Sequence, residues 1–171
     1  AAENVLLDRV VGRALSRIDH AAIRRDASRY MELVGLDIAP DARIEGLSPA
    51  QRQLIEIARA LSLDSRILLL DEPTASISLA EADALLETIR RLRARGVGVL
   101  YVSHKLEEVF EIADRVTVLR DGRNAAPTLE LSELDTRKLV ELMIGRSHSA
   151  AALPPRRPAA AGPVLEADGV W

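Results

Sequence analysis

The stretch that most constrains the fold runs from Ile67 to Pro73 and reads ILLLDEP. Four consecutive apolar residues followed directly by two carboxylates predict a strand, buried on both faces, that carries Asp71 and Glu72 at its carboxyl end. Open α/β sheets bind their ligands at that edge. A pair of carboxylates there can hold a metal ion and orient a water molecule. Pro73 also predicts an extended backbone at Glu72, because the proline ring disfavours a helical conformation in the residue before it.

The residues that follow predict an α/β fold in which a mostly parallel sheet is flanked by helices. Apolar residues recur at helical spacing from Leu79 until Gly96. Val97–Val102 then reads as a second buried strand, Lys105–Ala113 as a short helix and Arg115–Arg120 as a third strand. Strands that alternate with helices in this way predict parallel neighbours joined by right-handed crossovers.

The preceding residues predict helices. Residues 1–46 carry charged and apolar residues at helical spacing, which predicts a small helical subdomain with one helix ending at Gly35. The next helix has a clear start signal. Ser48 fits the N-cap, Pro49 the first helical position and Gln51 the capping-box partner three residues after the cap.

The remaining residues predict a turn and a helix, followed by a linker and the start of another domain. Asp121-Gly122 is typical of a hairpin turn, and a last helix is expected from Ser132 to Ile144, with Ser132 and Asp135 at capping-box spacing. Residues 146–162 are rich in proline and alanine and predict a linker, and residues 163–171 predict the first strand of another domain. The α/β part would then span residues 47–145.

Composition excludes several classes of partner and environment. The net charge of −3 comes from 23 basic and 26 acidic residues that are well mixed, so nothing favours binding to nucleic acid or to an anionic membrane. The chain has no cysteine, which excludes a disulfide framework and suits a reducing compartment. Its apolar runs are much shorter than the roughly 20 residues that a membrane-spanning helix needs.

One component of a nucleotide site does not occur in the sequence. A site with two carboxylates after a strand would need a glycine loop of the form G-x-x-x-x-G-K followed by serine or threonine, whose backbone amides cradle the phosphates. The two lysines, Lys105 and Lys138, do not follow glycine. Either the chemistry is different or the chain is part of a longer one, and the absence of an initiator methionine and the unfinished strand after the linker favour the second expectation.

Three motifs stand in order along the chain: LSPAQ at 47–51, ILLLDEP at 67–73 and VSH at 102–104. Together they resemble the signature motif, the acidic strand motif and the switch histidine of ABC-type ATPases, over most of residues 1–145. The wording LSPAQRQLIEIARAL, and ELMIGR ahead of the linker, look most like the first ATP-binding domain of bacterial monosaccharide importers of the ribose, galactose or xylose type. The resemblance implies a partial P-loop NTPase fold whose phosphate loop lies upstream of residue 1.

The resemblance implies roles for individual residues. Asp71 would bind Mg²⁺ through water, Glu72 would act as the base that polarises the attacking water, and His104 would contact the γ-phosphate of ATP. The residues Ser48, Ala50 and Gln51 would bind the ATP held by a partner domain. The family's usual L-S-G-G-Q is L-S-P-A-Q here, which removes one backbone donor, and Ser78 stands where the family has an aspartate.

The resemblance also implies partners and a location. It predicts a fragment of the energy-coupling subunit of a carbohydrate importer, which uses ATP and Mg²⁺ at the cytoplasmic face of the bacterial inner membrane. The partners would be membrane permease subunits, a second ATP-binding domain and, indirectly, a periplasmic sugar-binding protein, with no nucleic acid. The chain by itself is expected to be inactive and to expose apolar surface of its sheet.

Other readings of the same residues stay open. The Ser48 and Gln51 pair is equally explained as plain helix capping, and an Asp-Glu pair after a strand can be an ordinary polar loop. The carboxyl lobe of a chromosome-maintenance ATPase carries the same three motifs, although it should also show long heptad repeats, which residues 1–46 lack. A third possibility is a non-catalytic module that presents its signature face to the nucleotide of another protein.

Overall fold

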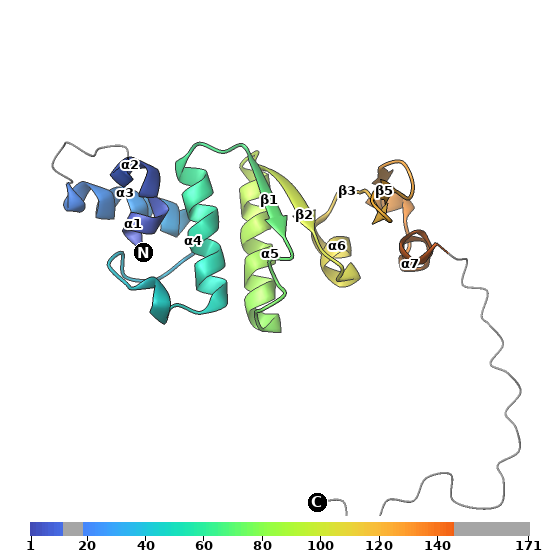
Figure 1. Cartoon of the computed structure of the whole chain (residues 1–171), viewed down its shortest axis with the longest axis horizontal. Helices are drawn as coiled ribbons and strands as arrows, with labels where there is room; N and C mark the ends of the chain where they lie inside the picture. Colours follow the sequence, from blue (N-terminus) through green and yellow to red (C-terminus); the bar gives the residue numbers. More distant parts are fainter. Residues whose placement is uncertain (12–18, 146–171) are drawn as a thin grey trace, which may run out of the picture. The chain divides into compact units, whose positions relative to one another are not determined.

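The computed structural model describes residues 1–11 and 19–145 (Figure 1). The chain divides into two compact units, one formed by residues 1–115 and the other starting at Val116. The linker predicted at 146–162 and the strand predicted at 163–171 lie outside the described residues. No helix within the described ranges is both long and apolar enough to cross a membrane.

The first unit opens with helices, as the spacing of residues 1–46 predicts. The elements are α1 (Ala2–Val5), α2 (Leu7–Val11), α3 (His20–Leu33), the 3₁₀ turn η1 (Ile44–Gly46) and α4 (Pro49–Ser62). The start of α3 is fixed by Asp19, whose carboxylate accepts hydrogen bonds from the amides of Ala21 and Ala22 at 3.0 Å. After α3 the backbone turns at Gly35, which has a φ of +71° that glycine adopts without steric cost.

A parallel strand pair follows α4 and carries the predicted carboxylates. It consists of β1 (Ile67–Asp71), the crossover helix α5 (Leu79–Ala94) and β2 (Gly98–Val102), and α6 (Leu106–Ile112) comes next. The two strands pair in parallel with Ile67 opposite Gly98 and Asp71 opposite Val102. Their carboxyl ends are therefore level, so the residues after Asp71 and after Val102 leave the same edge of the sheet.

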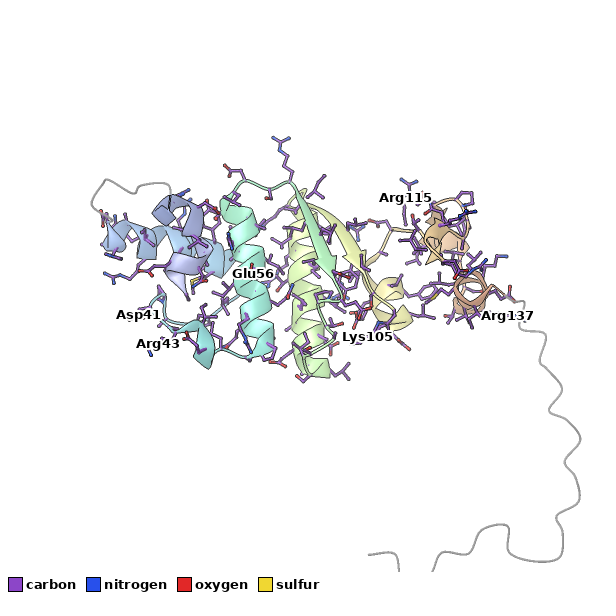
Figure 2. The ribbon with its side chains drawn as sticks, viewed as in Figure 1. Asp41, Arg43, Glu56, Lys105, Arg115 and Arg137 are labelled. Carbon is purple, nitrogen blue, oxygen red and sulfur yellow. The ribbon has the colours of Figure 1, made fainter. Side chains whose placement is uncertain are left out.

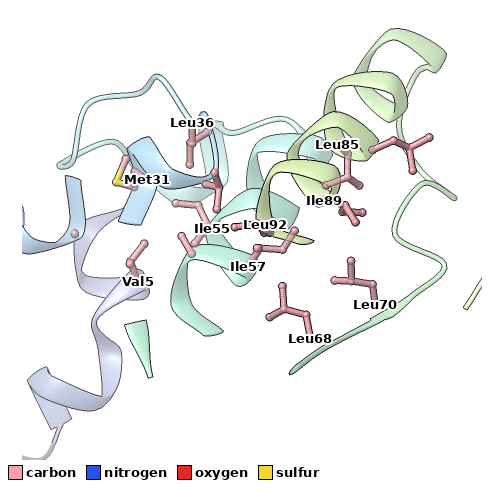
Figure 3. Close-up of a cluster of buried hydrophobic side chains, with 14 of the residues drawn as sticks. Val5, Met31, Leu36, Ile55, Ile57, Leu68, Leu70, Leu85, Ile89 and Leu92 are labelled. Atoms are coloured by element: carbon pink, nitrogen blue, oxygen red, sulfur yellow. The ribbon is translucent and has the colours of Figure 1, made fainter. Parts of the chain in front are cut away.

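One hydrophobic core joins the helices to the inner face of β1. Leu68 and Leu70 of β1 lie against the buried side of α5, and α5 in turn packs against α4 (Figure 3). Buried residues from the other helices complete the same cluster: Val5 of α1, Met31 of α3, Ile55, Ile57 and Ala58 of α4, and Leu85, Leu86, Ile89 and Leu92 of α5. The core thus holds β1 in place from one side.

The opposite face of the strand pair is open. Ile67 is 74% exposed and Leu69 is 66% exposed, and Leu100 and Val102 of β2 are exposed as well. The prediction that β1 is buried on both faces is therefore wrong for this chain, because only Leu68 and Leu70 are covered. The expectation of exposed apolar sheet surface is met.

The strand predicted at Arg115–Arg120 is divided in the structure. Instead of one strand over Arg115–Arg120, the structure has β3 (Arg115–Val116), in which the division between the units falls, and β4 (Leu119–Arg120). β3 pairs with β6 (Leu129–Glu130), and β4 pairs antiparallel with β5 (Arg123–Asn124), so neither extends the parallel pair. The predicted hairpin turn is confirmed at Asp121 and Gly122, which both have positive φ as a two-residue turn of this kind requires.

The last described helix starts later than predicted. Ser132 lies in the 3₁₀ turn η2 (Leu131–Glu133), and α7 runs over Thr136–Ile144. Asp135 is the N-cap, because its carboxylate accepts the amide of Lys138 at 2.6 Å. The proposed Ser132 and Asp135 capping box is therefore wrong, since Asp135 caps the helix by itself.

Candidate functional site

The candidate site lies at the carboxyl ends of β1 and β2. Asp71 is the last residue of β1, and the amide of Glu72 donates to the carbonyl of Val102 at 2.9 Å, which extends the strand pairing by one residue. Both acidic side chains are exposed. The structure therefore places Asp71 and Glu72 where the sequence predicts them, at the edge where open α/β sheets bind ligands.

The backbone at Glu72 differs from the prediction. Its φ is +42°, in the left-handed region that non-glycine residues rarely occupy, whereas Pro73 predicts an extended conformation. Two hydrogen bonds hold this residue, one from its own amide to Val102 and one from the amide of Ala75 to its carbonyl at 3.1 Å. Strained residues of this type persist only where the surroundings fix them, and they occur often at functional sites.

His104 meets Glu72 directly. Its Nδ1 atom lies 2.8 Å from Oε1 of Glu72, so the two predicted catalytic residues are in hydrogen-bond contact although 32 positions separate them. An ionised carboxylate only accepts hydrogen bonds, so this contact places a proton on Nδ1. In the neutral ring Nε2 is then an acceptor, and the ring can donate from both nitrogens only as the imidazolium.

The predicted nucleotide-binding residues form a second group at the start of α4. The backbone amide of Gln51 donates to Oγ of Ser48 at 3.2 Å, and the side-chain Oε1 of Gln51 accepts the backbone amide of Ser48 at 3.0 Å. The predicted capping box is therefore complete. Ala50, which is half-buried, lies between them in the first turn. The hydroxyl of Ser48 donates to Oε1 of Glu81 at 3.1 Å. Both side chains of the capping box are thus engaged within the chain.

Glu81 joins this group to the start of α5. Ser78 caps α5, and Oε2 of Glu81 accepts hydrogen bonds from the amide of Ser78 at 2.9 Å and from its hydroxyl at 2.8 Å. The backbone amide of Ser78, its hydroxyl and that of Ser48 together lower the pKa of Glu81. Ser78, where the resemblance leads one to expect an aspartate, is therefore the N-cap of the helix that follows the carboxylates.

A buried carboxylate behind the site was missed in the sequence. Glu108 of α6 is 9% exposed and accepts hydrogen bonds from Thr74 and Tyr101, both at 2.6 Å. Lys105, at the start of α6 (Figure 2), lies 3.1 Å from the same carboxylate. One signal was available, because Glu108 stands four residues before the buried Ile112 and so shares the inner face of the helix.

Magnesium can be tested against the donors present. Within residues 1–11 and 19–145, no group of three or more His, Cys, Asp or Glu residues could hold a metal ion. Mg²⁺ bound with a nucleotide takes one or two carboxylates and completes its shell with water and phosphate oxygens. The exposed carboxylate of Asp71 at the end of β1 fits that mode of binding.

Comparison with known proteins identifies the class to which this fold belongs. The family model of the ABC transporter matches residues 2–75. MJ1267, an ATP-binding cassette of an ABC transporter, superimposes with a TM-score of 0.71 and 21% identity over 84% of this chain and 60% of its own. A dimeric post-hydrolysis state of the cassette MJ0796, bound to ADP and Pi, gives a TM-score of 0.61 at 23% identity over 76% of this chain and 56% of its own. The structural likeness shows the fold of an ABC ATPase cassette.

Relatives in sequence are closer and show the family. The ribose import ATP-binding protein RbsA 3 of Rubrobacter xylanophilus is 46% identical over 145 residues, which cover 85% of this chain and 29% of the relative. The ribose import ATP-binding protein RbsA 2 of Burkholderia ambifaria is 43% identical over 99% of this chain and 34% of its own length. The chain therefore belongs to the ABC transporter family, and it spans about a third of the length of these curated relatives.

Proposed function

We propose that this chain is part of the ATP-hydrolysing subunit of a carbohydrate ABC importer. The observation that carries the proposal is the contact between Glu72 and His104 at 2.8 Å, next to Asp71, at the carboxyl edge of a parallel strand pair. The relatives at 43% and 46% identity, which are named as ribose import proteins, support the choice of a sugar as cargo.

In this proposal Glu72 is the general base for the attacking water. Hydrolysis of a γ-phosphate needs a group that orients the water and accepts its proton, and a carboxylate fixed at a strand end can do both. The His104 contact limits the directions in which the Glu72 carboxylate can point. Asp71 would hold Mg²⁺ through water, and the ion would supply positive charge to the phosphate oxygens.

His104 acts as the sensor of the γ-phosphate. With Nδ1 donating to Glu72, Nε2 is the atom left to meet a phosphate oxygen, which is also an acceptor. The ring therefore joins Glu72 to the phosphate as an imidazolium, or it gives up the Glu72 contact when ATP binds. In the first case the γ-phosphate changes the charge of the ring that contacts the base, and in the second case it removes the hydrogen bond between them.

Ser48 and the first turn of α4 would bind the γ-phosphate of ATP held by a second ATP-binding domain. Helix N-termini favour anions, and the hydroxyl of Ser48 is a donor. This hydroxyl donates to Glu81 in the structure, so the phosphate would have to replace Glu81 as its acceptor. The permease, the sugar-binding protein and the position at the cytoplasmic face of the membrane belong to the same proposal.

The open apolar face of β1 and β2 supports a longer protein. We assign it to the part of the subunit that carries the phosphate loop, which would pack on Ile67 and Leu69. The chain contains no phosphate loop, so the 171-residue chain is expected to hydrolyse no ATP.

A chimera tests the proposal. Residues 1–145 would replace the matching segment of the Rubrobacter xylanophilus relative, and phosphate release would be measured with Mg²⁺ and ATP. The chimera should hydrolyse ATP, Glu72→Gln should slow it by about 10²–10⁴-fold, and the exposed Glu107→Gln should not. A chimera that folds and binds ATP without hydrolysing it, or one that tolerates Glu72→Gln, would refute the assignment.

A further inference from the structure

The buried carboxylate of Glu108 connects the two segments that carry the proposed catalytic residues. Thr74, two positions after Glu72, donates from Oγ1 to Oε1 of Glu108 at 2.6 Å. From the other segment, Tyr101 donates to Oε2 at 2.6 Å and Ser103 donates to Oε2 at 3.2 Å. The carboxylate therefore contacts both segments.

Lys105, the residue after His104, belongs to the same cluster. Its ammonium group lies 3.1 Å from Oε1 of Glu108 and donates to both the carbonyl and the hydroxyl of Thr74 at 3.1 Å. The amide of Lys105 donates to the hydroxyl of Ser103 at 3.0 Å. The residues immediately before and after His104 are thus tied to Thr74 and Glu108.

The electrostatics of the cluster keep Glu108 ionised. Burial opposes ionisation, but hydrogen bonds from Thr74, Tyr101 and Lys105 outweigh it and lower the pKa of Glu108. Burial and the bond to Glu108 raise the pKa of Tyr101, which remains a donor. A buried charge whose hydrogen bonds are all made rigidifies its surroundings, and no buried side-chain polar atom in the described residues lacks a partner.

The contact between Glu72 and His104 is not stabilised by burial in the way that the Glu108 cluster is. The side chains of Glu72 and His104 are both partly open to solvent, and exposed ion pairs contribute little to holding two segments together. The geometry that keeps Nδ1 of His104 near Glu72 must therefore come from the backbone segments beneath it. Glu108 contacts both of those segments, and Lys105 adds a direct link from the segment of His104 to Thr74.

We propose that Glu108 is a positioning residue for hydrolysis, whose carboxylate fixes the segment of Glu72 and the segment of His104 relative to each other. It touches neither the water nor the phosphate and acts through the two residues that do. The role in hydrolysis rests on the proposed function. The effect of Glu108 on the two segments can be measured even if that function is wrong.

Kinetics of the chimera test the catalytic consequence. Glu108→Gln keeps the size of the side chain but loses its charge and one acceptor oxygen, and it should lower kcat by roughly 10 to 100-fold, as expected for a small misplacement of reacting groups. KM for ATP should stay within about twofold, because ATP-binding groups are not altered. Tyr101→Phe, which removes a single hydrogen bond, should lower kcat less, and Glu107→Gln on the exposed side of α6 should leave it unchanged.

Hydrogen exchange of the 171-residue chain gives a readout that needs no hydrolysis. Amides in the peptides covering residues 72–75 and 103–105 should exchange about tenfold faster in Glu108→Gln than in Glu107→Gln, with exchange in α3 unchanged. An unaltered kcat in an active Glu108→Gln chimera would overturn the inference while leaving the proposed function intact. Equal exchange in the two variant chains would overturn it as well. An inactive chimera that carries the natural residues would instead refute the proposed function, and exchange alone would then decide the role of Glu108.

Discussion

Leucine truncations on the two faces of β1 test whether the open face is an unfinished core. Leu68 and Leu69 are neighbours of the same type on one strand, but Leu68 is 3% exposed and Leu69 is 66% exposed. In the 171-residue chain, Leu68→Ala should lower the free energy of unfolding by about 2–5 kcal/mol, as for other buried leucines. Leu69→Ala should cost roughly 1 kcal/mol, because only a third of the side chain is covered.

The same pair should behave differently in the chimera. If the remainder of the subunit covers the face, Leu69 loses its remaining exposure. Full burial of a leucine contributes about 1.5–3 kcal/mol, so covering the exposed two thirds adds about 1–2 kcal/mol to the cost of Leu69→Ala. The cost of Leu68→Ala should not change, since that side chain is already buried in the chain alone.

Urea unfolding followed by far-ultraviolet circular dichroism measures both costs from the shift in midpoint and the slope. Equal costs for Leu68→Ala and Leu69→Ala in the 171-residue chain would refute the fold described for β1, since the outer face would then already be covered. An unchanged cost of Leu69→Ala in the chimera would refute the claim that the rest of the subunit packs there.

Three further predictions concern the caps, a turn and a buried charge. Ser78→Ala should lower the free energy of unfolding by about 1 kcal/mol through loss of the α5 cap, as measured by urea midpoint, and a neutral result would contradict the capping role. Gly35→Ala should be destabilising by about 1 kcal/mol or more, because φ at this position is +71°. Its melting temperature should be lower than that of the control Gly46→Ala, since Gly46 has no positive φ. The pKa of Glu108 is lower in the folded than in the unfolded chain, so its stabilisation is complete above the ordinary glutamate pKa of about 4.3 and is lost as pH falls through the folded value. Unfolding midpoints should thus fall more steeply below about pH 5 in the natural chain than in Glu108→Gln, and parallel pH profiles would contradict the linkage.

Local patterns were enough to predict the elements that carry the site. The apolar run Ile67–Leu70 with its carboxylates, the cap at Ser48 and the turn at Asp121 and Gly122 each depend on neighbours in sequence, and each is found in the structure. The contact of Glu72 with His104 was not predicted, and it arises because the parallel order of the strands brings their carboxyl ends to one edge.

The predictions that failed depend on contacts between distant residues. Arg115–Arg120 has a strand-like composition, but its two halves find different partners, which no local pattern specifies. The conformation of Glu72 is fixed by its hydrogen bond to Val102, which overrides the preference that Pro73 imposes. The spacing of Glu108 from Ile112 could indicate that it faces inward, but its role could not be predicted, because that role comes from three residues on two other segments.

A double-mutant cycle in the chimera tests whether Glu72 and His104 act as one unit in hydrolysis. The measurement is kcat for Glu72→Gln, His104→Ala and the variant that carries both changes. The double variant should be about as slow as the slower single variant, because Glu72→Gln removes the base and His104→Ala removes the ring that contacts and orients it. A double variant whose loss equals the product of the two single losses would contradict it, since the two residues would then act independently.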